Sequence, residues 1–187
     1  MSLPRTAPGV SAARHGSDVL RPILRYGEDA LHAPARPVTG ITADTQTLID
    51  DMIETMYAAP GVGLAATQIG EPRRIFVIDL SLGRASGDLV VMVNPELLER
   101  EGTQLEEEGC LSVPGFNATV LRPSRVVCKG LDRDGREQKI EGTDLLARAF
   151  QHEMDHLDGT LFVDRLRGIK RDMILRRIQK LKKSGKW

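Results

Sequence analysis

Cysteines are scarce in this 187-residue chain: it contains two, Cys110 and Cys128, and neither belongs to a CxxC pair. A disulfide framework requires more of them, so we expect a reducing compartment, the cytoplasm. Long apolar runs are also absent, and none approaches the roughly 18 residues that a membrane span needs. The N-terminus lacks the apolar region of a secretory signal. These absences argue against a disulfide-rich secreted protein and against an integral membrane protein.

Acidic and basic residues balance at 26 each, but their distribution along the chain is uneven. Residues 165–187 carry ten basic side chains and one acidic, a net charge of +9, which leaves 16 basic and 25 acidic side chains, or −9, before them. Residues 1–17 contain no acidic residue and are rich in Ser, Ala, Pro and Gly. We therefore predict a flexible tail over 1–17, one folded domain over 18–167 and a basic C-terminal helix over 168–187.

Apolar periodicity and turn signals predict the secondary structure. Helices are expected over about 44–58, 145–157 and 168–183. Strands are expected at 74–80, 89–94, 125–131 and 138–140, the first two forming a hairpin. Residues suited to begin or end helices are Thr42 or Asp44, Thr143 or Asp144, and Gly159.

This order of elements indicates an α+β fold rather than alternating βαβ units. We expect a single compact domain in which mixed or antiparallel sheets pack around the central helix 145–157. An N-terminal amphipathic helix and the basic C-terminal helix complete it.

The central predicted helix contains the run Gln151-His152-Glu153-Met154-Asp155-His156. Because positions i and i+4 share one face of a helix, His152 and His156 can bind the same metal ion. Glu153 follows the first histidine, where its carboxylate can reach an activated water and handle its proton. The pattern predicts a metal-dependent hydrolase, and its alternative is a surface helix with exposed histidines.

The third ligand decides the type of site, because a catalytic site has three protein ligands and one open position for water. Extended zincin motifs place a histidine six residues after the second ligand, and here that position is Phe162. No glutamate follows Glu153, so only the aspartates Asp158, Asp164 and Asp172 remain on that side. Of the other histidines, His15 lies in the predicted tail and His32 in an irregular segment before Pro34. The third ligand is therefore expected upstream of the helix.

Cys110 is the best candidate for that ligand. It lies in the segment Glu106–Gly115, whose glycines and proline predict a rigid loop. The three glutamates before it would raise the pKa of a free thiol, which argues against a nucleophilic cysteine. A divalent cation removes this objection because coordination deprotonates the thiol. The alternative, a buried inert cysteine, is our prediction for Cys128, which lies in an apolar strand-like run.

Three segments, Gly61–Gln68, Glu108–Ser112 and Gln151–His156, match in order the motifs GxGxAAxQ, EGCLS and QHExDH. In these motifs the chain resembles the peptide deformylase family, enzymes that remove the N-formyl group from new bacterial-type polypeptides. The likeness extends over residues 19–167, and the tail and C-terminal helix are matched only loosely.

The resemblance implies a metal held by Cys110, His152 and His156, with Glu153 as general base and later as general acid. Fe²⁺ is expected in the cell, and Zn²⁺, Ni²⁺ or Co²⁺ can take its place. The substrate is expected to be an N-formylmethionyl nascent peptide, which an activated water attacks.

Substrate contacts follow from the same resemblance. The Gln68 amide and the backbone N–H of Leu111 would stabilise the developing oxyanion, and the backbone of Gly63 would bind the peptide. A methionine side chain needs an apolar pocket. Apart from the resemblance, we expect Val62, Leu145 and Ala149 to line it; for Leu145 the alternative is a side chain packed in the core.

One position departs from the family pattern. Many bacterial members carry an arginine seven residues after the cysteine, where it helps to hold the downstream peptide, and here that residue is Asn117. Arg122 lies nearby in sequence and is a candidate to replace it.

Two alternatives stay open at this point. An HExxH endopeptidase is opposed by the missing downstream ligands and by the Cys110 segment. A non-enzymatic ribosome-binding module with a structural metal would need four protein ligands, and three strong ones are visible. The basic C-terminal helix suits docking to the ribosome, a phosphate-rich partner, or it is a solvated helix packed on the body. We expect the protein to be a monomer.

Overall fold

The computed structural model describes residues 19–85 and 87–187, so the tail predicted over 1–17 lies outside the described residues. The strands are β1 (Gly63–Ala65), β2 (Ile75–Ile78), β3 (Val90–Glu101), β4 (Gln104–Gly109), β5 (Asn117–Arg122), β6 (Arg125–Leu131) and β7 (Glu137–Thr143). The helices are α1 (Ala43–Ala58), α2 (Asp144–Leu157), α3 (Phe162–Arg165) and α4 (Ile169–Lys183), with 3-10 turns η1 (Asp29–His32) and η2 (Ala66–Ile69).

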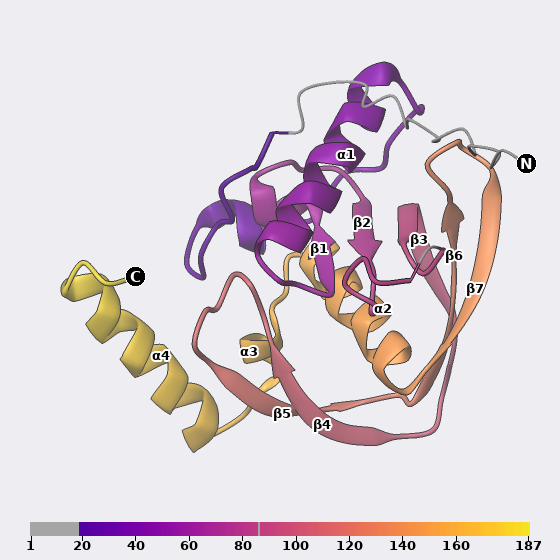
Figure 1. Ribbon diagram of the computed structural model, residues 1–187. Coiled ribbons are helices and arrows are strands. Elements are labelled where there is room, and N and C mark those ends of the chain that lie inside the picture. The colour runs from indigo at the N-terminus through magenta and orange to yellow at the C-terminus, as the bar shows by residue number, and fades with distance from the viewer. Residues whose placement is uncertain (1–18, 86) are drawn as a thin grey trace, which may run out of the picture.

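A central helix, α2, organises the two sheets (Figure 1). The larger sheet has the strand order β1-β2-β3-β6-β7, and every neighbouring pair in it is antiparallel. β4 and β5 form a separate two-stranded antiparallel ribbon, which contacts α2 through Glu108 and lies across α2 from the larger sheet (Figure 1). The predicted α+β fold around the HExxH helix is confirmed. Among the described residues, no helix is both long and apolar enough to cross a membrane.

β2 is apolar throughout because both faces of the sheet are covered. Successive side chains of a strand point to opposite faces. Ile75 and Val77 pack with α1, while Phe76 and Ile78 pack with α2, and all four are fully buried. Burying each such side chain is worth about 1.5–3 kcal/mol. β2 pairs with β3, as the predicted hairpin requires.

The ends of the predicted helices are largely as expected. The Thr42 side chain accepts a hydrogen bond from the Thr45 N–H and caps α1. Thr143 is the N-cap residue of α2, as predicted, but its side chain makes no capping hydrogen bond. Gly159 follows α2 with φ of +75°, a conformation that glycine adopts without strain, and this confirms the predicted stop.

The segment Glu106–Gly115 was expected to be a rigid loop, and for its first part that prediction is wrong. The chain is a strand up to Gly109, where β4 ends. β5 was not predicted either, and β3 and β7 extend beyond their predicted ends. β4 contains three successive glutamates, so its sequence does not show the alternation of apolar and polar residues that predicts a strand. The strand is stabilised by pairing with β5 and by the buried side chain of Glu108.

The basic C-terminal helix is confirmed, starting one residue later than predicted. It packs on the body through Ile178, the one buried residue of α4, with Ile174 and Leu175 partly buried beside it. Ile169 and Met173 remain 76% and 64% exposed. The helix is thus attached along one side and free along the other.

Candidate metal centre and active site

α2 and the turn after β4 bring the three predicted ligands together. His152 and His156 lie one helical turn apart, with ring centroids separated by 5.0 Å. Cys110 directly follows β4, and its Sγ lies 3.2 Å from Nε2 of His156. Ligand atoms of all three residues lie within 4.8 Å of one another.

This donor set fits a divalent cation. Metal–sulfur and metal–nitrogen bonds of about 2.3 and 2.1 Å in a tetrahedron place ligand atoms roughly 3.3–3.6 Å apart, close to the 3.2 Å between Cys110 and His156. Burial and the charges of His152 and Arg122 hold the pKa of His156 well below its usual range, which leaves the neutral, metal-binding form. Burial alone would lower the pKa of His152, but Cys110 and Glu108 hold it well above its usual range. Such a negative environment also favours a cation.

Glu153 lies beside these ligands and is 4% exposed. Burial raises the pKa of Glu153 to about 7; the charge of His152 opposes the shift, and those of Asp155 and Glu108 add to it. Its Oε2 is buried and has no hydrogen-bond partner among the described residues. Its Oε1 comes so close to Gly63 that a Cβ there would lie 2.3 Å away. A carboxyl group with a pKa near neutrality can take up and release a proton at physiological pH.

Gln68, in η2, presents its amide NH₂ to the centre. The N–H of Ala65 donates to its Oε1 at 2.9 Å, which fixes the orientation of the amide. The NH₂ nitrogen then lies 3.1 Å from Oγ of Ser112 and 3.6 Å from Sγ of Cys110. Leu111 belongs to the same turn as Cys110. Both residues predicted to stabilise an oxyanion therefore lie next to the metal ligands.

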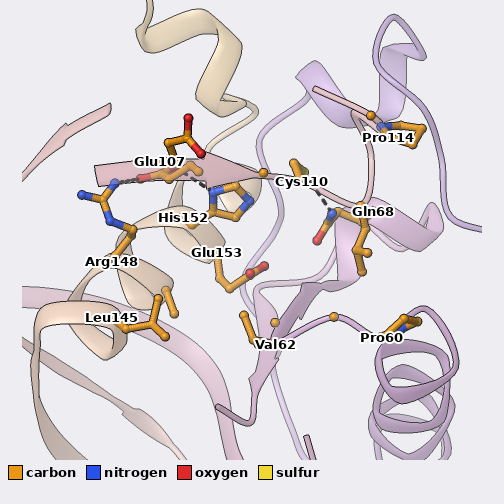
Figure 2. Close-up of a pocket in the computed structure, with 17 residues that line it drawn as sticks. Pro60, Val62, Gln68, Glu107, Cys110, Pro114, Leu145, Arg148, His152 and Glu153 are labelled. Carbon is orange, nitrogen blue, oxygen red and sulfur yellow. Dashed lines mark hydrogen bonds and ion pairs between the residues drawn. The ribbon is translucent and has the colours of Figure 1, made fainter. Parts of the chain in front are cut away.

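A cavity of about 440 Å³ opens in front of the centre, and in Figure 2 Glu153 lies between His152 and Val62. The segment before β1, the turn after β4 and one face of α2 form its walls. The four residues predicted to bind substrate all line it: Val62, Gly63, Leu145 and Ala149. Leu145 is 54% exposed at the rim, whereas Ala149 is buried.

Glu108 binds the ring nitrogen of His152 that faces away from the centre. Nδ1 of His152 lies 3.0 Å from Oε2 of Glu108. Arg122 donates to both carboxylate oxygens, at 2.7 and 2.8 Å, and Arg148 donates to Oε1 at 2.7 Å. Burial alone would raise the pKa of Glu108, but hydrogen bonds from Arg122 and His152 hold it at about 2. A carboxylate in this place fixes the orientation of a metal-binding histidine.

Arg122 does not replace the arginine that is missing at Asn117, so that prediction is wrong. It is 2% exposed, it also donates to Asp155 at 2.7 Å, and it does not line the cavity. Cys128 is fully buried in β6, and burial raises the pKa of its thiol to about 12, as expected for an inert cysteine.

The roles of Glu108 and Arg148 were not predicted from the sequence. Glu108 belongs to the EGCLS motif, of which only the cysteine was considered as a ligand. Had a strand been predicted at this position, the side chain of Glu108 would have been expected to point towards α2. Arg148 precedes His152 by four residues, so helical spacing alone places both on one face.

The polypeptide deformylase family model matches residues 20–172. The chain belongs to this family. A peptide deformylase from Acidobacterium capsulatum is 47% identical over 169 residues, which cover 90% of this chain and 99% of that one. Family membership makes the chain a hydrolase with a catalytic metal, for which Cys110, His152 and His156 form a suitable cluster.

Solved deformylase structures share the fold. That of a peptide deformylase from Legionella pneumophila has a TM-score of 0.84 and 46% identity, covering 89% of this chain and 98% of that one. A class I type b peptide deformylase from Acinetobacter baumannii with bound Met-Ala-Ser has a TM-score of 0.75 and 36% identity, covering 80% and 100%. Neither the endopeptidase nor the ribosome-binding module is favoured by these similarities.

Proposed function

We propose that this deformylase removes the N-formyl group from the formyl-methionine of new polypeptides by activating a water at Cys110, His152 and His156. The observation that carries the proposal is the three-ligand cluster at the end of a cavity, with a buried carboxyl group beside it. The bound Met-Ala-Ser of the Acinetobacter relative supports a peptide that begins with methionine.

A divalent cation on these ligands would polarise the attacking water and the formyl carbonyl. The oxygen of the water attacks the formyl carbon, and Glu153 takes up the proton that the water loses. The amide of Gln68 and the N–H of Leu111 donate hydrogen bonds to the carbonyl oxygen as it becomes an anion, and one such donor is worth about 3–4 kcal/mol. Glu153 then gives the proton to the departing amine, which leaves formate and a free N-terminus.

We propose that a narrow centre selects the formyl group. A Cβ on Gly61 would lie 2.7 Å from Cδ1 of Leu111, and one on Gly63 would meet Glu153, so the backbone of both glycines lies directly against side chains of the centre. A formyl carbon carries only hydrogen, whereas an acetyl group adds a methyl. We therefore expect formyl-Met-Ala-Ser to be hydrolysed and acetyl-Met-Ala-Ser to resist.

We propose that Val62, Leu145 and Ala149 receive the methionine side chain, because all three line the cavity beside α2. Leu145→Ala should then lower kcat/KM for formyl-Met-Ala-Ser more than for formyl-Ala-Ala-Ser. An unchanged ratio between the two peptides would remove Leu145 from the pocket.

The central experiment is an anaerobic deformylation assay with formyl-Met-Ala-Ser. Glu153→Gln keeps the size of the side chain and removes its ability to take a proton, so kcat should fall by about 10²–10⁴-fold while metal content is retained. Glu137→Gln, on the 74% exposed side chain of a β7 glutamate, is the matched control. An inactive wild type, or equal activity in Glu153→Gln, would overturn the proposal, and digestion of casein would favour the endopeptidase.

We propose Fe²⁺ as the cation in the cell, on the strength of the family resemblance. A thiolate and two imidazoles suit Fe²⁺ and Zn²⁺ alike, so the ligands alone do not choose. Protein purified anaerobically should contain iron and lose activity in air. Fully active protein that contains only zinc would contradict this.

We also propose that α4 docks on the ribosome. The net charge of +9 over residues 165–187 suits an RNA partner, and α4 leaves Arg176, Arg177 and Lys180 exposed. Replacing these three by glutamate should abolish co-sedimentation with ribosomes and leave turnover of formyl-Met-Ala-Ser unchanged. Undiminished co-sedimentation would contradict the docking.

We propose a monomer that acts in the cytoplasm. One chain supplies every side chain of the site, and the two cysteines are free thiols. Light scattering after gel filtration should give the mass of one chain, 20.6 kDa.

A further inference from the structure

The carboxylate of Glu108 receives four hydrogen-bond donors, one for each of its lone pairs. Oε1 accepts from Nε of Arg122 and Nη1 of Arg148, each at 2.7 Å. Oε2 accepts from Nη2 of Arg122 at 2.8 Å and lies 3.0 Å from Nδ1 of His152. The three charged side chains are at most 5% exposed. The carboxylate therefore cannot rotate without breaking a buried, charged hydrogen bond.

The two arginines hold this carboxylate from different elements. Arg122 comes from β5, and its remaining nitrogen is directed to Asp155, at 2.7 Å. Arg148 comes from α2, four residues before His152, so both lie on the same face of the helix. Glu108 is thus fastened to α2 at two points one turn apart, the guanidinium of Arg148 and the imidazole of His152.

Arg148 is itself held in place. Its Nε donates to Oε1 of Gln104 and its Nη1 to the carbonyl of Val120, both at 3.2 Å. Gln104 in turn donates to the carbonyls of Pro123 and Asp144, each at 2.9 Å. A buried guanidinium is costly to desolvate unless it is paired. Here Nη1 is paired with Glu108, whereas Nη2 is buried and has no hydrogen-bond partner among the described residues. Such a rigid arrangement suits a group that positions another.

We propose that Arg148 is a positioning residue of the metal centre: it holds Glu108 so that the ring of His152 is oriented towards the cation. The idea rests on the proposed function only in requiring a cation on Cys110, His152 and His156. It does not require deformylation. Arg148 acts on the metal through Glu108, and its removal should therefore loosen the metal.

The test measures the rate at which the full-length protein releases Co²⁺ into excess chelator. The release is monitored by the loss of the thiolate-to-cobalt absorption band. Arg148→Met keeps an unbranched apolar stem on the cavity wall and removes the guanidinium. Loss of an outer-shell partner typically costs about 10–100-fold in metal affinity, so release should be faster by about that factor. Arg148→Lys keeps the buried charge but has one nitrogen, and its release rate should lie between those of Arg148→Met and wild type. If Arg148→Met fails to fold, faster release from Arg148→Lys supports the proposal.

Arg125→Met is the matched control. Arg125 is paired with Glu99, Glu101 and Glu141 on the larger sheet and does not line the cavity. Its removal should change thermal stability and leave Co²⁺ release unchanged. A merely structural role for Arg148 would give the same pattern.

A double-mutant cycle decides whether Arg148 acts through Glu108. In a Glu108→Gln background, Arg148→Met should accelerate release by less than about two-fold, because the carboxylate it positions is gone. Equal factors in both backgrounds, or unchanged release from folded Arg148→Met, would overturn the proposal. Wild type that binds no Co²⁺ would overturn the metal centre and this role together, whereas wild type that binds Co²⁺ without deformylating would overturn only the proposed function.

Discussion

An alanine at position 63 should disable the proposed general base and leave the metal ligands intact. A Cβ on Gly63 would lie 2.3 Å from Oε1 of Glu153 and 3.0 Å from its Cδ. Real contacts of this kind are essentially never shorter than 3.0 Å, so the carboxylate must move by roughly 1 Å. Misplacing a reacting group by about 1 Å can cost about 100-fold in rate, or about 2.7 kcal/mol. We therefore expect kcat/KM to fall by about two orders of magnitude.

The assay is deformylation of formyl-Met-Ala-Ser together with metal analysis of the same samples. Gly40→Ala is the control, because a Cβ there meets nothing within 4 Å. In a Glu153→Asp background the shorter side chain withdraws from position 63, so Gly63→Ala should cost much less than in wild type. The reasoning would be refuted if Gly63→Ala kept kcat/KM within two-fold of wild type, or if it lost activity only by losing metal.

Three further predictions concern stability and oxyanion binding. Burial alone would raise the pKa of Asp79, but hydrogen bonds, first among them that from Tyr57, lower it from 3.8 to about 2. A carboxyl group with a lowered folded-state pKa stabilises the fold above the unfolded pKa and loses this effect as the pH falls from about 4 to 2. Asp79→Asn should lower the free energy of unfolding at pH 7 by about 2 kcal/mol and flatten its dependence between pH 4 and 2 in urea titrations. Gly159→Ala should lower Tm and the free energy of unfolding by at least about 1 kcal/mol, because φ is +75° and a Cβ would lie 2.8 Å from the carbonyl oxygen of His32; an unchanged Tm would contradict this. Gln68→Ala should lower kcat by about 10²–10³-fold with metal content unchanged, and a normal kcat would exclude its oxyanion role.

Local patterns in the sequence predicted most of the secondary structure. Apolar residues at helical spacing located α1, and a capping residue before the helix with a glycine after it located α2. Continuous apolar runs located β2 and the start of β3, whose faces are both covered. β4 was missed because Glu106, Glu107 and Glu108 show no apolar alternation, and its partner β5 was missed as well. That ribbon depends on strand pairing and on buried ion pairs with α2, which are contacts between segments far apart in the chain.

The sequence by itself determined the chemistry of the site. Helical spacing placed His152 and His156 on one face, since residues i and i+4 are neighbours on any helix. The absence of a downstream histidine or glutamate and the acidic segment before Cys110 pointed to that cysteine, and the motifs indicated the family. Only the tertiary structure decided how the site is held: Glu108 and His152 are 44 residues apart in the chain, and their contact exists because the ribbon packs across α2. The partners of the buried Glu108 carboxylate are set by this packing. The roles of Arg122 and Arg148 could therefore be assigned only from the tertiary structure.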